Sequence, residues 1–237
     1  MTNRGILALG LLLFLSAPVS GQFQDIIDGL GLGKQPSLSN DKITAGLKEA
    51  LRVGTSNTVQ LTGRVDGYFR NEAIKILMPE KLRTVEKGMR FAGFGPQVDE
   101  LVLSMNRAAE KAAPLAKDIF IKAILEMSFD DARGIFTGGD TAATDYFKAK
   151  TTGHLTDAFT PIVEQSMKEV GVIKQFDQLL KTTQQIPFLK VPSLDIRQYV
   201  VTKALDGIFF VLSQEERNIR KNPAARVTRL LKDVFGR

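Results

Sequence analysis

The sequence lacks cysteine and tryptophan and contains a single histidine, His154. Without cysteine, the chain can form neither a disulfide nor a thiolate metal site. A Ser–His–Asp relay or a histidine-based metal site would have to use His154, which follows Gly153 in a polar stretch where we expect a solvated helix junction. Signatures of phosphate-binding loops, nucleophile elbows and dinucleotide folds are also missing. We therefore assign no catalytic residue, and we expect no metal and no cofactor.

The first residues have the pattern of a bacterial export signal. Arg4 precedes an apolar stretch from Ile6 to Leu15, and the small residues that follow it end at Gly21, so cleavage is predicted before Gln22. This stretch is shorter than the roughly 20 residues that span a bilayer, and no later segment is apolar enough to span one. The sequence thus predicts a signal peptide over residues 1–21, no transmembrane segment after its removal, and a periplasmic location.

The rest of the chain predicts an all-α protein. Residues 22–38 contain Gly29, Gly31, Gly33 and Pro36 and predict a flexible lead-in, whereas residues 39–237 predict a single α-helical domain with Ser39 as its first N-cap. Apolar residues recur every three or four positions, and no strand-like alternation of useful length occurs. At 43% hydrophobic and 24% charged residues, the chain can form a sizeable core. We expect a single-domain, multi-helix, bundle-like array.

Several local signals refine this expectation. Arg64 to Met78 interrupts the helical rhythm and predicts an irregular connector. Pro114 is expected to kink or divide a long helix, and Pro161 to start or kink another. Asp140 is expected to cap the helix that carries Tyr146.

Two segments have the spacing of an N-terminal capping box. Ser128 and Asp131 are three residues apart before a short helix. Ser213 and Glu216 repeat the spacing, so we expect a break or bend near Leu212.

Two groups of polar residues are candidates for ligand or partner binding. Asn106, Arg107 and Glu110 punctuate an Ala-rich helix, where they either line a cleft or fix the register of packed helices. Tyr68 and Arg70 lie in the connector, where they either bind a ligand or anchor the loop to the core. The sequence leaves both alternatives open.

Basic residues are concentrated near the C-terminus. The candidate basic surface consists of Arg217, Arg220, Lys221, Arg226, Arg229 and Lys232. The last three are spaced by three residues and are predicted on one side of a final helix that begins at Pro223. Such a face suits an anionic lipid surface or an acidic envelope partner. A terminal helix that is docked on the domain with its basic face in solvent has the same pattern. Nucleic acid is not expected as a partner, because no recognition motif is present.

Several motifs together resemble one family. They are Asp66-Gly-Tyr-Phe-Arg-Asn71, Ile74-Lys-Ile-Leu-Met-Pro-Glu80, Ser104-Met-Asn-Arg-Ala-Ala-Glu110, Ala142-Ala-Thr-Asp-Tyr-Phe147 and Leu230-Leu-Lys-Asp-Val-Phe-Gly236. In this order they resemble the bacterial family known as domain of unknown function 4197, from about Ser39 to Gly236. Leu77 and Val227 depart from the family pattern, which has Pro and Thr there. The resemblance implies an exported protein and supplies no activity, ligand or catalytic residue.

Taken together, these patterns predict an exported bacterial envelope protein that is not an enzyme and binds a partner or an apolar or anionic ligand. Two alternatives stay open. One is a periplasmic enzyme with a carboxylate-containing cleft that acts on cell-wall or sugar substrates, and the other is a structural oligomer. The sequence identifies neither the ligand nor the oligomeric state.

Overall fold

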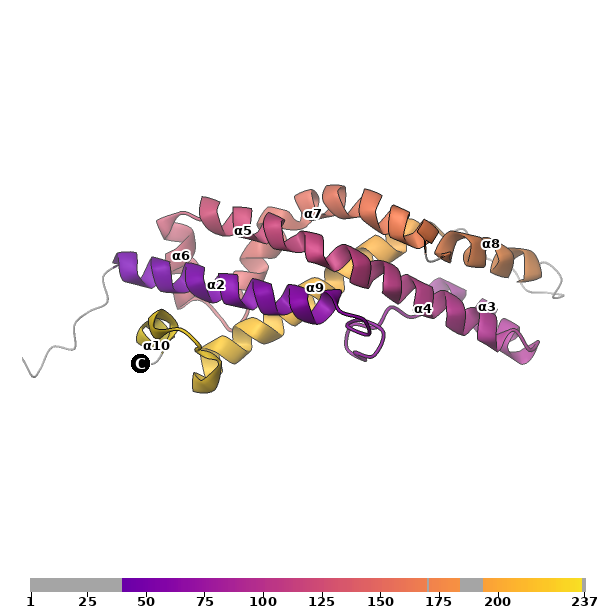
Figure 1. Cartoon of the computed structure of the whole chain (residues 1–237), viewed down its shortest axis with the longest axis horizontal. Coiled ribbons are helices and arrows are strands. Elements are labelled where there is room, and N and C mark those ends of the chain that lie inside the picture. The colour runs from indigo at the N-terminus through magenta and orange to yellow at the C-terminus, as the bar shows by residue number, and fades with distance from the viewer. Residues whose placement is uncertain (1–39, 170, 184–193, 236–237) are drawn as a thin grey trace, which may run out of the picture. The chain divides into compact units, whose positions relative to one another are not determined.

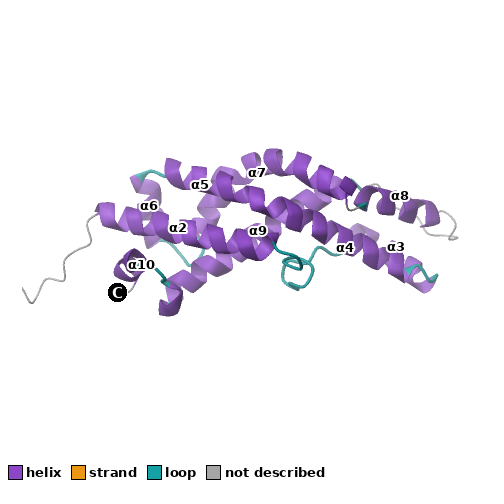
Figure 2. Ribbon diagram, viewed as in Figure 1, coloured by secondary structure: helices purple, strands orange, loops and turns teal. Residues whose placement is uncertain are grey.

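The computed structural model describes residues 40–169, 171–183 and 194–235. These residues belong to one compact unit, Ser39–Arg237. All regular secondary structure within the described ranges is helical (Figure 2), which confirms the predicted all-α class. The signal peptide, the lead-in and the cap predicted within residues 1–39 lie outside these ranges. Among the described helices, none combines the length and apolar character needed to cross a membrane.

An irregular connector separates α2 from the 3-10 turn that precedes α3 (Figure 1). The bounds of the helices are α2 (Asn40–Gly63), α3 (Arg83–Phe91), α4 (Gly95–Ala112), α5 (Ala116–Glu126), α6 (Phe129–Thr137), α7 (Ala142–Glu169), α8 (Val172–Thr183), α9 (Ile196–Lys221) and α10 (Arg229–Phe235). Single 3-10 turns are formed by η1 (Glu80–Leu82), η2 (Ala113–Leu115) and η3 (Pro223–Ala225).

The centre of the unit is built from α2, α4, α7 and α9. Helix α7 packs against α9 and α4, and α2 packs against α9 from another side (Figure 1). Phe120 of α5 meets Phe147 of α7 and Phe209 of α9 edge to face, with ring centroids 5.3 and 5.9 Å apart. Such pairs are favourable beyond the area that they bury, and they join three helices at one point of the core.

The two helix-breaking prolines behave differently. Pro114 lies in η2, which separates α4 from α5, so the predicted interruption is confirmed. Pro161 lies inside α7, which continues to Glu169, so no new helix starts there. A proline removes only one backbone donor, and the packing of α7 against α4 and α9 keeps the helix continuous.

The two capping-box patterns also have different outcomes. Ser128 and Asp131 form the predicted box at the start of α6, with hydrogen bonds in both directions. The predicted break near Leu212 is absent, because α9 continues through this position to Lys221. The Ser213 hydroxyl donates to the Phe210 carbonyl oxygen within α9 at 2.7 Å instead.

The final helix begins later than its sequence suggests. Pro223 opens only the short turn η3, and α10 starts at Arg229 and packs against α2. Val227, which the predicted helix would include, is 67% exposed in the segment between η3 and α10.

Candidate functional site

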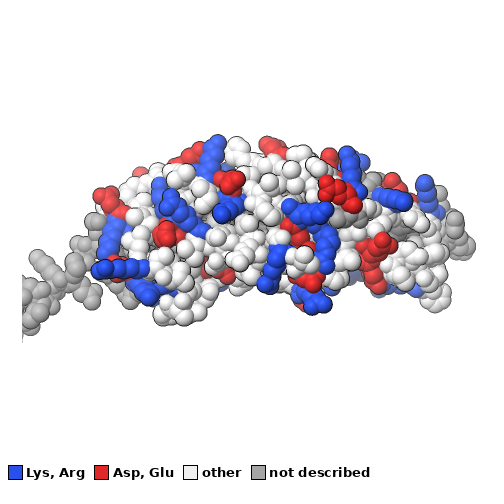
Figure 3. Space-filling model, viewed as in Figure 1, with Lys and Arg blue, Asp and Glu red and all other residues white. Residues whose placement is uncertain are grey.

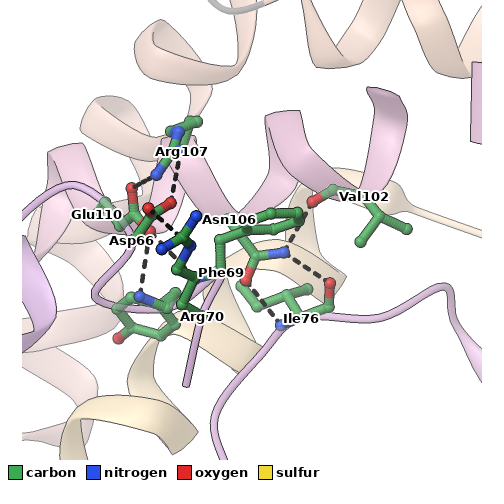
Figure 4. Close-up of polar contacts among 9 residues, drawn as sticks. Asp66, Phe69, Arg70, Ile76, Val102, Asn106, Arg107 and Glu110 are labelled. Atoms are coloured by element: carbon green, nitrogen blue, oxygen red, sulfur yellow. Dashed lines mark hydrogen bonds and ion pairs between the residues drawn. The ribbon is translucent and has the colours of Figure 1, made fainter. Parts of the chain in front are cut away.

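The connector, residues 64–79, is irregular as predicted and is held against α4 by the polar residues of that helix (Figure 4). Arg107 Nη2 lies 2.7 Å from Asp66 Oδ1, and its Nη1 lies 2.6 Å from Glu110 Oε2. The backbone N–H groups of Tyr68 and Phe69 both donate to Glu110 Oε1, each at 3.1 Å. Glu110 is only 4% exposed, and these contacts satisfy a carboxylate that would be costly to bury alone.

Charge is also compensated around Arg107. Partial burial opposes its charge, but the hydrogen bonds to Glu110 and Asp66 outweigh this effect and raise the pKa of Arg107 above its ordinary value. The guanidinium carbon lies 5.7 Å from the centre of the Phe69 ring. Arg107 therefore stays charged while it ties the connector to α4.

Asn106 holds the middle of the connector. The Ile76 N–H donates to Asn106 Oδ1 at 2.9 Å, and Asn106 Nδ2 donates to the carbonyl oxygens of Ile76 and Val102 at 2.8 and 2.7 Å (Figure 4). The side chain is 0% exposed. The oxygen and the nitrogen of this buried side-chain amide both bind backbone groups, which indicates a role in packing.

Tyr68 anchors the connector to α9. It is 0% exposed, and its hydroxyl donates to the Ala204 carbonyl oxygen at 2.6 Å. Burial raises the pKa of the Tyr68 hydroxyl far above its ordinary value, with a further contribution from the negative charge of Glu110. A methyl group at Gly207 would overlap the Tyr68 ring, so α9 needs glycine there.

Of the five residues proposed for ligand or partner binding, only Arg70 has an exposed side chain, and its Nε lies 3.2 Å from Asp66 Oδ2. The structure brings the two groups together around the connector, where their polar atoms bind one another and the backbone. These contacts favour the packing alternative over the binding alternative.

Three of the six residues of the predicted C-terminal basic surface are engaged in internal contacts. Arg220 Nη2 lies 2.9 Å from Glu216 Oε1 and donates to the Ile135 carbonyl oxygen at 2.8 Å. Lys221 pairs with Asp140. Basic and acidic side chains are interspersed over the face that Figure 3 shows, so no single cationic face replaces the predicted one there.

The predicted stripe of Arg226, Arg229 and Lys232 does not form on one helix, because Arg226 precedes α10. Its guanidinium donates to the carbonyl oxygens of Ile219 and Arg220 at 3.1 and 2.8 Å. These are carbonyls of the last turn of α9, which a helix leaves unpaired. Arg229 and Lys232 are exposed on α10, and Arg217 is half-buried on α9.

Glu216 is a central residue that the sequence reasoning missed. It is 8% exposed, and its carboxylate accepts hydrogen bonds from the backbone N–H groups of Ala143 and Thr144, each at 2.9 Å. A carboxylate at the first turn of α7 favours the helix through its unpaired N–H groups and its dipole. Asp140, the predicted cap of this helix, pairs with Lys221 instead. The only sequence signal for Glu216 was its spacing from Ser213, which indicated a different helix start.

A groove of about 530 Å³ between α5 and α7 contains the single histidine. His154 lies within α7, so the predicted helix junction is wrong. The Tyr146 hydroxyl lies 3.5 Å from Asp131 Oδ2 on the groove wall. Hydrogen bonds from Ser128 lower the pKa of Asp131, and burial raises the pKa of Tyr146.

Acid–base catalysis works best with groups whose pKa lies near the working pH. The shifts of Asp131 and Tyr146 move both groups away from neutrality. Within the described ranges, no three acidic or histidine side chains gather as a metal ion would require. The groove has the dimensions of a binding site, and its arrangement does not point to an acid–base pair.

A second hollow, of about 620 Å³, is strongly basic. We name it the cationic groove, and its lining residues are Lys168, Lys174, Asp177, Gln178, Lys181 and Arg197. They come from the end of α7, the polar face of α8 and the start of α9. In the described part of the chain, none of the four cations of the groove forms an ion pair, in contrast to Arg107 and Arg220.

Part of this groove has a signal in the sequence. Lys174, Asp177, Gln178 and Lys181 recur at three or four residues, which places them on one face of α8. Lys168 and Arg197 belong to other helices, and only the fold brings them to that face.

Comparison with known proteins gives a family and nothing further. A family model described as "Protein of unknown function (DUF4197)" matches residues 37–236. No curated protein and no solved structure matches the chain.

Proposed function

The chain belongs to the DUF4197 family of proteins of unknown function, and we propose that it is a non-enzymatic module that binds an anionic ligand in the cationic groove. We further propose that it acts in the bacterial envelope, in the periplasm, which rests on the signal-peptide pattern of residues 1–21.

The observation that carries the proposal is the set of unpaired cations around one hollow. Lys168, Lys174, Lys181 and Arg197 are exposed and surround a space that contains one carboxylate, from Asp177. Like charges held close together repel one another, and a groove lined by one sign of charge raises the local concentration of the opposite ion. An anion in the groove would relieve the repulsion and add charge-assisted hydrogen bonds.

The rest of the molecule supports a binding role at this place. Arg107, Arg220 and Arg226 donate to groups of the chain itself and stabilise the connector and the end of α9. The cations of the cationic groove have no such internal task within the described residues. Their side chains are free to meet a ligand.

The test is a calorimetric titration of the protein with inorganic pyrophosphate, a compact anion without an apolar part. We expect binding at low salt that weakens strongly at 1 M salt, where the Debye length falls to about 3 Å. The double variant Lys174→Gln/Lys181→Gln should bind about tenfold more weakly, because two surface charge contacts together contribute roughly 1.4 kcal/mol.

The matched control is Arg52→Gln/Lys117→Gln, which removes the same charge from exposed positions on α2 and α5. Its affinity should stay within about twofold of the unaltered protein, since neither residue lines the cationic groove. The proposal fails if pyrophosphate does not bind at low salt, or if the control loses as much affinity as the groove variant.

A further inference from the structure

An apolar hollow adjoins the cationic groove. It measures about 520 Å³ and lies between α8 and the start of α9, where its apolar lining consists of Phe176, Leu180, Leu194 and Ile196. Asp177 and Arg197 line both spaces, so the two are continuous at these residues. A cationic site therefore adjoins a space whose wall combines these four apolar side chains with the charged side chains of Asp177, Asp195 and Arg197.

The amphipathic character of α8 explains the arrangement. Phe176 and Leu180 are four residues apart on its apolar face, and Lys174 and Lys181 lie on its polar face. The boundary between the two faces runs along the helix. A ligand that lies across this boundary would meet charge at one end and hydrocarbon at the other.

We propose that the ligand is an amphiphile with an anionic headgroup and a linear alkyl chain, which rests on the proposed function of the cationic groove. The headgroup binds among Lys174, Lys181 and Arg197, and the chain lies along Leu180 and Leu194. Each space falls within the roughly 300–1,000 Å³ of typical small-molecule sites.

The acidic residues of the two spaces are compatible with this orientation. Asp195 accepts hydrogen bonds from the backbone N–H groups of Arg197 and Gln198 at 2.9 and 3.2 Å, so its carboxylate is engaged in capping α9. Asp177 lines both spaces and is the one carboxylate among the four cations that line the cationic groove. The excess of positive charge therefore lies at the headgroup end.

The experiment is a titration of the full-length protein with monomeric alkyl phosphates from butyl to dodecyl, each below its micelle concentration. The affinity should rise about fourfold for each methylene that enters the apolar hollow, and then level off when the space is filled. Lys174→Gln/Lys181→Gln should weaken every member of the series by a similar factor, because the headgroup is the same.

The variant that tests the chain site is Leu194→Gln, since this half-buried residue precedes α9 and lies outside the helices. It should flatten the dependence on chain length and leave the affinity for butyl phosphate within about twofold, because its headgroup contacts are retained. The control is Leu125→Gln, which changes a leucine that is 60% exposed on α5 and should leave the dependence unchanged. Circular dichroism of each variant verifies that the helices are retained.

Sedimentation with phosphatidylglycerol vesicles separates two sources of such a ligand. Binding of both the vesicles and the monomeric phosphates supports a membrane lipid, whereas binding of the monomers alone supports a free amphiphile. If dodecyl phosphate binds no more tightly than butyl phosphate, the amphiphile inference is overturned while salt-sensitive pyrophosphate binding would still support the proposed function. If neither phosphates nor pyrophosphate bind, both are overturned.

Discussion

Removal of the Glu216 carboxylate should destabilise the protein more than removal of an exposed acid from the same helix. In Glu216→Ala, the N–H groups of Ala143 and Thr144 lose the acceptor that lies 2.9 Å from each of them. Arg220, whose side chain is 13% exposed, loses its ion-pair partner. The substitution therefore affects the start of α7, the end of α9 and a buried charge together.

The size of the effect follows from these contacts. An orphaned buried N–H group costs about 1–3 kcal/mol, and the loss of one partner of a buried ion pair costs about 3–5 kcal/mol. These contributions overlap because they share one carboxylate, so we expect the free energy of unfolding to fall by about 3–5 kcal/mol in total. For a domain of this size, that corresponds to a decrease in Tm of roughly 6–20 °C.

The measurement is urea unfolding followed by circular dichroism at neutral pH. The control, Asp206→Ala, removes an acid of α9 whose side chain is 53% exposed and pairs with Lys203; it should cost less than about 1 kcal/mol. Adding Arg220→Met to Glu216→Ala should recover part of the loss, because the unpaired charge is then absent. The account of α7 is refuted if Glu216→Ala loses no more stability than Asp206→Ala.

Three further outcomes follow from single residues. Asn106→Ala should lower the free energy of unfolding by about 2–4 kcal/mol in urea, because the buried Ile76 N–H loses its acceptor; a loss below about 1 kcal/mol would contradict this role. Hydrogen bonds from Ser128 lower the pKa of Asp131 below its ordinary value of 3.8, so the carboxylate stabilises the fold above that pH and this stabilisation disappears as the pH falls through the lowered pKa. Asp131→Asn should therefore flatten the acid limb of the stability–pH curve, and an unchanged limb would speak against it. Phe91 is 97% exposed, so Phe91→Ser should change the stability by less than about 0.5 kcal/mol, and a clear drop in Tm would mean that the side chain has a packing partner.

The sequence was a good guide where the partners lie close together along the chain. In the capping box, the side chains of Ser128 and Asp131 each accept a hydrogen bond from the other residue's backbone N–H. Because the two residues are three positions apart, their spacing alone predicts the box. The interruption at Pro114 was also predicted correctly, because this proline lies in the short turn between two helices. The pairing of Arg107 with Glu110 follows from their positions on one helix face.

Where a polar residue binds a group that is distant in the sequence, the same kinds of pattern gave wrong predictions. Ser213 and Glu216 have capping-box spacing, but both lie inside α9, which packs against α2 and α7. The Glu216 carboxylate binds the backbone of α7. The spacing of Arg226 and Arg229 suggested one basic helix, whereas Arg226 binds carbonyls at the end of α9. Periodicity predicts which face of a helix is apolar, but it does not identify which polar group of another element will meet it.

Glu110 and Glu216, the two charged residues that are buried in the described part of the chain, share one arrangement. Each accepts two adjacent backbone N–H groups from an element far along the chain, and each is paired with an arginine one turn away on its own helix. The arginine compensates the charge, and the N–H groups give the carboxylate a specific position. Two long helices can thereby hold the connector and the start of α7 without a disulfide. The cations of the cationic groove take no part in either arrangement, so Lys174→Gln/Lys181→Gln should cost the fold little stability.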